Sequence, residues 1–477
     1  ELIRLSGMDA WFCNTLAVVY SFVISFFFGY LTEHYPGKNL FEIIFDIAGR
    51  WIGGILNLFI LIHLWLILVR DVRGYAKYLG TVLLPNTPEE VLVLVMGVLL
   101  IYFGNYNLEV ISRTNEIFFP IFFIMVALMP LMLWNEIDFR HVEPLLVSPL
   151  PNIVAGNTLT VGWYGELFVA GAFLHAVMNG RQTKAALRHG IVIGTVLLTV
   201  FLVLEVLVLG TKFPAISLYT RYSLAQQIHI TEFLDRVDLI LVSLWFFIET
   251  VKILIIYLAF LLCIGSYVGR RHSKLFNKPG AILIIITAMF AFKSTSSMFS
   301  FGIYGSIATG VAYQPLLIAV IWLLIVWQRR KRGRFNGRPA LDRDRSATGA
   351  QSERAHPAGA ASADSSGVVP GDLNRRSAAE PRREPAARPN RYERRSGFRR
   401  QVNSMLNGWA LKSELRTWNR RTNLLLLAMI ILIALGLALS PHYSLIGLLC
   451  GIGFALALIL MLLTTAMELF RTGDNRQ

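Results

Sequence analysis

Uninterrupted apolar runs, each close to the length of a membrane-spanning helix, recur along almost the whole chain. A helix that crosses the hydrocarbon core needs ~20 mostly apolar residues. Only 16% of the residues are charged, against about a quarter in a soluble domain. This pattern excludes a soluble enzyme and predicts an all-α polytopic membrane protein. Nine runs fall in a first domain, 1–328, near 10–31, 51–69, 88–104, 115–134, 158–179, 190–210, 238–268, 280–298 and 303–327.

The net charge of +15 is concentrated in one hydrophilic stretch. Residues 329–400 hold 18 Arg and one Lys against eight acidic residues, and almost no large apolar side chains. Such a segment cannot bury enough surface to offset the entropy lost on ordering, so we predict a basic disordered linker. Basic residues also gather at 180–190 and 269–279, which places these loops and the linker in the cytoplasm. The charge therefore gives no indication of a nucleic-acid partner.

The chain after the linker returns to the membrane. Residues 401–422 alternate basic and apolar side chains, which predicts an amphipathic segment lying on the bilayer surface. Two apolar runs, 423–440 and 445–467, follow and are separated by a short polar turn. We expect residues 423–477 to form a two-helix transmembrane hairpin with a short tail.

The fifth apolar run contains the most informative polar cluster. Its sequence over 158–166 is TLTVGWYGE, with Gly162 and Gly165 on either side of Trp163 and Tyr164, directly before Glu166. Ionisable groups inside a membrane are costly and indicate functional sites by default. Glycines beside them are typical of the broken helices that expose backbone groups to a small ligand in transporters. The alternative is a glycine packing face, with Glu166 near the outer interface.

Other polar groups within the runs are less specific. Trp245, Glu249 and Lys252 are spaced by four and three residues, which places them on one helical face. Glu249 and Lys252 can neutralise each other, so they are either ligand groups or a purely structural ion pair. Asn57 and His63 are lone polar residues, a pattern more typical of hydrogen bonds between helices than of ligand contacts.

No sequence motif indicates catalysis. The chain has no Ser-His-Asp order, no phosphate-binding glycine loop, no HExxH and no CxxC. Its three cysteines lie far apart in apolar runs, without the spacing of a disulfide framework or a metal site. We therefore expect no catalytic residue, no metal and no cofactor.

Several short motifs occur in a fixed order over residues 7–327. They are GMDAW at 7–11, YPGKNL at 35–40, LPNTP at 84–88, the pair Gly165-Glu166 and VKI at 251–253. In this order and spacing the chain resembles the spore germination permease family. Members of that family are the B subunits of bacterial germinant receptors, within the amino acid–polyamine–organocation superfamily.

The resemblance implies a LeuT-like bundle of ten helices in a five-plus-five inverted repeat, with helices one and six interrupted around a small-molecule site. Counted in this way, the chain lacks helix one, and Glu166 falls on helix six. The pocket is then expected to be incomplete without helix one. The residue pattern and the resemblance together predict nine ligand-binding residues, which are Gly162, Trp163, Gly165, Glu166, Asn57, His63, Trp245, Glu249 and Lys252. The hairpin resembles the small two-helix accessory subunit that some germinant-receptor operons encode.

The function implied by the resemblance is detection of a small nutrient, such as an amino acid, that triggers spore germination. The expected surroundings are the inner membrane of the spore, with the lipid bilayer and other germinant-receptor subunits as partners. The alternative is an amino acid transporter coupled to H⁺ or Na⁺, which needs the same cavity. A purely scaffolding membrane protein is a third possibility.

Overall fold

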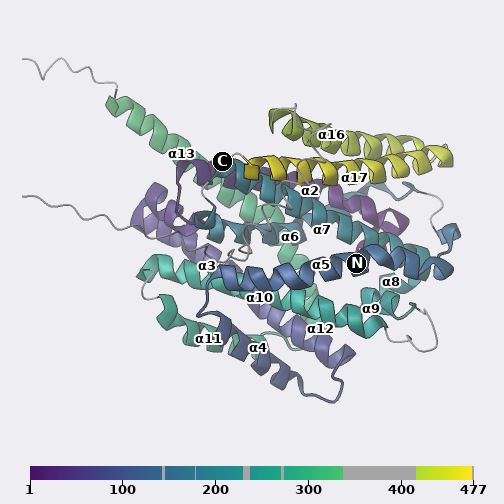
Figure 1. Ribbon diagram of the computed structural model, residues 1–477, viewed down its shortest axis with the longest axis horizontal. Helices are drawn as coiled ribbons and strands as arrows, with labels where there is room; N and C mark the ends of the chain where they lie inside the picture. The colour runs from purple at the N-terminus through teal and green to yellow at the C-terminus, as the bar shows by residue number, and fades with distance from the viewer. Residues whose placement is uncertain (142–144, 178, 229–236, 270–272, 337–414, 475–477) are drawn as a thin grey trace, which may run out of the picture. The chain divides into compact units, whose positions relative to one another are not determined.

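The computed structural model describes residues 1–141, 145–177, 179–228, 237–269, 273–336 and 415–474, and these residues contain helices and no strand (Figure 1). This confirms the predicted all-α polytopic architecture. Residues 1–327 and 414–477 form one compact unit, and 328–413 form a second, of which only the end of α13 is described. The helices include α2 (Thr15–His34), α3 (Leu40–Val82), α4 (Glu89–Phe103), α5 (Leu108–Met132), α6 (Leu150–Tyr164), α7 (Gly180–Leu209), α10 (Val237–Val268), α11 (Asn277–Phe290), α12 (Thr295–Ser300), α13 (Gln314–Asn336), α16 (Leu415–Leu439) and α17 (Ser444–Asp474).

Eight stretches of the described chain are long and apolar enough to cross a membrane. The first covers Leu2–His34, in which α1 (Leu2–Ser6) and the 3₁₀ segment η1 (Gly7–Asn14) precede α2. Three predicted spans are helical but do not reach this length. Helices α4 and α11 have 15 and 14 residues, or roughly 21–23 Å at 1.5 Å per residue, which is less than the ~30 Å core. The third is interrupted.

The interrupted span lies where the sequence carries its glycines. Helix α6 ends at Tyr164 and continues as the 3₁₀ segment η4 (Gly165–Ala176). The helix begins at Leu150, eight residues before the predicted start, because Pro149 and Pro151 suit the first turn of a helix. A second irregular region, of π-type turns, separates α12 from α13 as η6 (Phe301–Gly305) and η7 (Ala308–Tyr313).

Helix α3 begins with a capping box formed by Asn39 and Glu42. The Asn39 side chain accepts a hydrogen bond from the Glu42 amide at 2.9 Å, and the Glu42 carboxylate accepts one from the Asn39 amide at 3.2 Å. The first turns end at Gly49, whose φ of 78° is unfavourable for residues with a Cβ. The residues before Gly49 therefore form a separate short segment at the start of α3.

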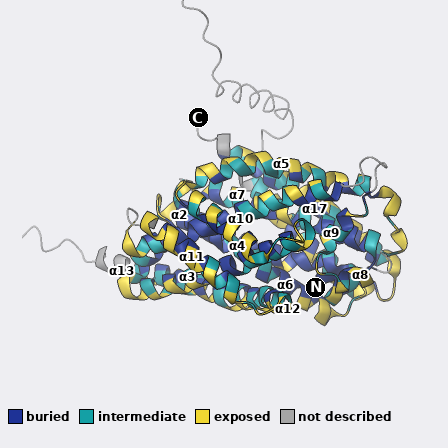
Figure 2. Cartoon of the chain, turned by 90° about the horizontal axis from the view of Figure 1, so that it is seen from below, coloured by how far each residue is buried: buried dark blue, intermediate teal, exposed yellow. Residues whose placement is uncertain are grey.

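Apolar side chains are distributed as expected for a protein in lipid. Buried positions lie between the helices and exposed ones along their outward faces (Figure 2). Exposed apolar residues include Phe59 on α3, Ile124 on α5 and Leu456 on α17. Large exposed apolar area is tolerated here because the hydrocarbon core, and not water, is the solvent.

The C-terminal hairpin packs against the same compact unit. Helices α16 and α17 lie side by side, and α17 runs along α7 (Figure 1). Helix α16 begins at Leu415, so residues 415–422 continue a helix that we predicted to start at 423. The linker over 337–400 and the surface segment over 401–414 lie outside the described residues.

Candidate functional site

The break between α6 and η4 rests on glycines that let two irregular segments touch. A Cβ on Gly162 would lie 2.6 Å from the Ser306 carbonyl, and one on Gly310 would lie 2.7 Å from Gly162 Cα. Gly165 allows a second approach, because its carbonyl accepts a hydrogen bond from Gln314 Nε2 at 2.9 Å. Gly162 thus serves close packing, the alternative considered from sequence, and Gly165 combines close packing against Gln314 with a hydrogen bond from that side chain.

Glu166, one residue beyond the break, lies in a cluster of five charged side chains. Its carboxylate bonds with the Arg70 guanidinium and lies 3.2 Å from Lys252 Nζ. Asp71 lies 2.5 Å from Arg70 Nη2 and 3.0 Å from Lys252 Nζ. Glu249 lies 3.3 Å from Lys252. The cluster joins three elements, with two members on α3, one on η4 and two on α10.

The charges in this cluster do not balance. Three carboxylates surround one guanidinium and one ammonium group, so the site carries one excess negative charge when all five groups are ionised. The side chains are also incompletely enclosed, with exposures of 16% for Arg70, 23% for Glu166 and 36% for Lys252. An unbalanced, partly open set of charges can exchange its internal partners for those of a ligand, because buried ions require compensation of some kind.

A polar network adjoins the charge cluster on the side of the helix break. Gln314 on α13 donates to Gly165, accepts from the Tyr20 hydroxyl at 2.9 Å and lies 3.4 Å from His63 Nε2. Ser306 accepts a hydrogen bond from Arg70 at 3.1 Å. The break is therefore linked on one side to His63 and on the other to the charge cluster.

The structure brings some of the candidate residues together and separates others. Glu166, Glu249 and Lys252 share the cluster, and His63 is one hydrogen bond away from the break. Asn57 donates to the Phe41 carbonyl at 2.9 Å across the kink of α3, far along the helix from the cluster. Trp245 packs on Tyr78, with ring centroids 4.5 Å apart. Trp163 packs in an apolar group with Ile303 and Ile307.

Arg70 and Asp71 were missed by the sequence reasoning. The second apolar run ends at residue 69, so both residues lie just beyond the predicted span. In the structure α3 continues to Val82. Extending the helical period would have found them, because His63 and Arg70 are two turns apart on one face. Among the described residues, no three His, Cys, Asp or Glu side chains are arranged to hold a metal ion.

A profile of the family described as "Spore germination protein" matches residues 2–297. The chain belongs to the spore germination protein family. The match includes every residue of the charge cluster and ends before the hairpin. As a member of this family with eight candidate spans, the protein is a multi-pass integral membrane protein.

Individual relatives are distant but match over most of their own length. The chain is 27% identical over 333 residues to the Bacillus subtilis (strain 168) protein YfkT, covering 68% of this chain and 89% of the relative. From the same organism, "Spore germination protein KB" is 19% identical over 342 residues, covering 70% and 91%. "Spore germination protein B2" is 23% identical over 338 residues, covering 66% and 86%.

Proposed function

We propose that this protein is the membrane-embedded, ligand-binding subunit of a germinant receptor in the inner membrane of the spore. Its ligand is a small zwitterionic nutrient such as an amino acid. The observation that carries the proposal is the unbalanced charge cluster of Arg70, Asp71, Glu166, Glu249 and Lys252 beside a helix break. Membership of the spore germination protein family supports the biological role and the association with other receptor subunits.

The chemistry of an amino acid complements this cluster. Its ammonium group can bind Glu166 or Glu249, and its carboxylate can bind Arg70 or Lys252. A zwitterion adds no net charge, so it acts by replacing ion pairs within the cluster. The Gly165 carbonyl lies at the break, one residue from Glu166, and accepts a hydrogen bond from Gln314. The residues proposed to contact the ligand are therefore Glu166, Arg70, Lys252 and Glu249.

Exchange of ion pairs on ligand binding would also change the conformation of the protein. In the free protein Glu166 links η4 to α3 through Arg70 and to α10 through Lys252. A ligand that takes over one of these bonds changes how the three elements are held together. Such a ligand shifts the equilibrium between two helix arrangements only by the difference in its affinity for them, so its charged groups must fit one arrangement better.

The alternative is an amino acid transporter coupled to H⁺ or Na⁺. One feature of the cluster supports a transporter: carboxylates that exchange partners inside a membrane also serve proton relays. The two functions differ in whether substrate crosses the bilayer.

The deciding experiment compares uptake with germination. The full chain is reconstituted in proteoliposomes, and uptake of radiolabelled amino acids is measured under an imposed pH or Na⁺ gradient. In parallel, spores lacking the gene are tested for germination with the same amino acids. A receptor gives loss of germination to at least one amino acid without gradient-driven uptake. Concentrative uptake that the Glu166→Gln variant loses identifies a transporter instead.

A further inference from the structure

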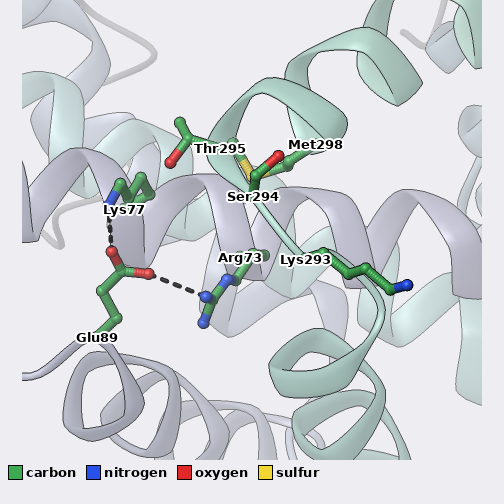
Figure 3. A pocket seen from close by; sticks show the side chains of 7 residues that line it. All are labelled: Arg73, Lys77, Glu89, Lys293, Ser294, Thr295 and Met298. Carbon is green, nitrogen blue, oxygen red and sulfur yellow. Dashed lines mark hydrogen bonds and ion pairs between the residues drawn. The ribbon is translucent and has the colours of Figure 1, made fainter.

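A separate cavity of about 160 Å³ lies between α3, the start of α4 and the loop that joins α11 to α12 (Figure 3). Arg73 and Lys77 line it from α3, Glu89 from α4, and Lys293 from the loop. None of these residues belongs to the charge cluster around Glu166. The volume has room for several water-sized groups.

The contacts of Glu89 indicate that the cavity can hold a carboxylate group. Both oxygens of the Glu89 carboxylate are held, one by Lys77 and the other by Arg73 at 3.1 Å (Figure 3). The three side chains are partly open, with exposures of 24% for Glu89, 32% for Lys77 and 19% for Arg73. Arg73 and Lys77 together face one carboxylate, so one positive charge is uncompensated among these three groups, while the exposed Lys293 directs its ammonium group away from Glu89 (Figure 3). Opposite Glu89, the cavity wall carries the hydroxyls of Ser294 and Thr295.

The position of the cavity connects it to the interior. Arg70, Arg73 and Lys77 are spaced by three and four residues, so they follow one face of α3 over roughly 10 Å at 1.5 Å per residue. The segment that begins at α12 covers this face. Met298 lies 3.8 Å from a Cβ built on Gly74, and Ser306 bonds with Arg70. On the orientation predicted from the basic loops, Lys77 is at the outer end of α3 and Arg70 is deeper in the membrane.

We propose that this cavity is a second binding site, which takes a small carboxylate in exchange for Glu89. The incoming carboxylate receives the same two charge-assisted bonds, from Arg73 and Lys77, and the surplus positive charge of the lining favours it over a neutral molecule. Glu89 at the first turn of α4 then moves toward solvent. The proposal is independent of the germinant role, because it concerns small carboxylates in general.

The test removes the resident carboxylate. Glu89→Gln is compared with wild type in the detergent-solubilised full chain, with thermal unfolding followed by a thiol-reactive dye that detects the buried Cys13, Cys263 and Cys450. Acetate replaces chloride at constant ionic strength. In chloride, we expect Glu89→Gln to have a lower melting temperature than wild type. In acetate, its melting temperature should rise saturably. The acetate concentration that gives half of this rise should be at least tenfold lower for Glu89→Gln than for wild type. The added substitution Lys77→Gln should abolish this recovery.

The matched control is Glu109→Gln, which removes a carboxylate from the exposed Glu109–Arg113 pair on α5 without any cavity. An acetate response of Glu89→Gln no greater than that of Glu109→Gln overturns the proposal. So does stabilisation of Glu89→Gln by phosphatidylglycerol nanodiscs but not by acetate, since the occupant is then a lipid phosphate.

A second measurement applies if Glu89→Gln does not fold. Wild-type protein should broaden the ¹⁹F resonance of trifluoroacetate, and Lys77→Gln should remove the broadening. Lys212→Gln, which changes an exposed lysine outside the cavity, should not. Equal broadening by wild type and Lys77→Gln contradicts the site.

Discussion

The charge cluster around Glu166 and the ion pair between Arg188 and Glu468 differ in how completely their charges are compensated. The cluster around Glu166 has three acids, two bases and side-chain exposures of up to 36%. The second set joins α7 to the hairpin. There Arg188 lies 3.3 Å from Glu468, with side-chain exposures of 1% and 5%. Arg188 also donates to Asn419 and, at 2.7 Å, to Asn423.

The difference separates a structural ion pair from a candidate binding site. The Arg188 set has one cation, one anion and two amide acceptors, and the Phe22 ring lies 4.5 Å from the guanidinium carbon. The two charges of this pair balance, and almost no surface is open to a ligand, although Arg188 Nε and Glu468 Oε2 make no hydrogen bond among the described residues. The Glu166 cluster has both a surplus charge and an opening. A buried charge by itself does not make a site a candidate for ligand binding. The Glu166 cluster is a candidate because its charges are incompletely compensated and partly accessible.

The largest expected effect is on the Arg188 set. Arg188→Met leaves Glu468 ionised and enclosed, and removal of one partner of a buried pair costs ~3–5 kcal/mol. We expect a strongly lowered melting temperature and loss of protease protection of the hairpin. The double variant Arg188→Met/Glu468→Met should recover most of the stability. A double variant no more stable than the single one would show that the amide bonds, and not the ion pair, hold the hairpin.

Lys252→Met should destabilise the protein less, by about 2–3 kcal/mol, because the side chain is 36% exposed and water screens the stranded carboxylates. The measurement is the protein level in spore membranes by immunoblot, together with the melting temperature. Lys278→Met, in the predicted cytoplasmic loop, is the control. A normal protein level combined with altered nutrient sensitivity would instead indicate that Lys252 contacts the ligand and contributes little to stability.

Glu166→Gln keeps the shape of the side chain and removes its charge. Loss of a charge-assisted hydrogen bond costs ~1.5–3 kcal/mol, which corresponds to a rise of roughly tenfold to a hundredfold in the nutrient concentration needed. A dose–response of spore germination at verified protein level tests this. An unchanged half-maximal concentration would make Glu166 a structural residue like Arg188.

The smallest effect is expected at Asn57, whose side chain donates a hydrogen bond to the Phe41 carbonyl across the α3 kink. Asn57→Ala should cost ~1 kcal/mol of stability and leave the dose–response unchanged. The melting temperature and the germination curve measure the two consequences. A shifted germination curve at normal stability would place Asn57 in the ligand site after all.

Several features were predictable because they depend on neighbouring residues. The Asn39–Glu42 capping pair, the break before Glu166 and the one-face spacing of Glu249 and Lys252 all follow from local rules. Three of the predicted spans are not single helices of spanning length, because α4 and α11 have 15 and 14 residues and α6 breaks at Gly165. The count of nine spans stays a prediction. Hydropathy measures composition within a window, and a window does not detect where a helix ends.

The amino-acid sequence by itself determined that this protein is a helical membrane protein of the spore germination family and that Glu166 follows a break in a span. Its pattern of apolar runs is a one-dimensional property, and lipid restricts the fold to helices whose backbone groups bond internally. Only the tertiary structure decided which charges compensate each other. Arg70 meets Glu166 across 96 residues and Arg188 meets Glu468 across 280. Such pairings depend on how helices pack, which local periodicity does not encode, and they distinguish the open cluster from the closed one.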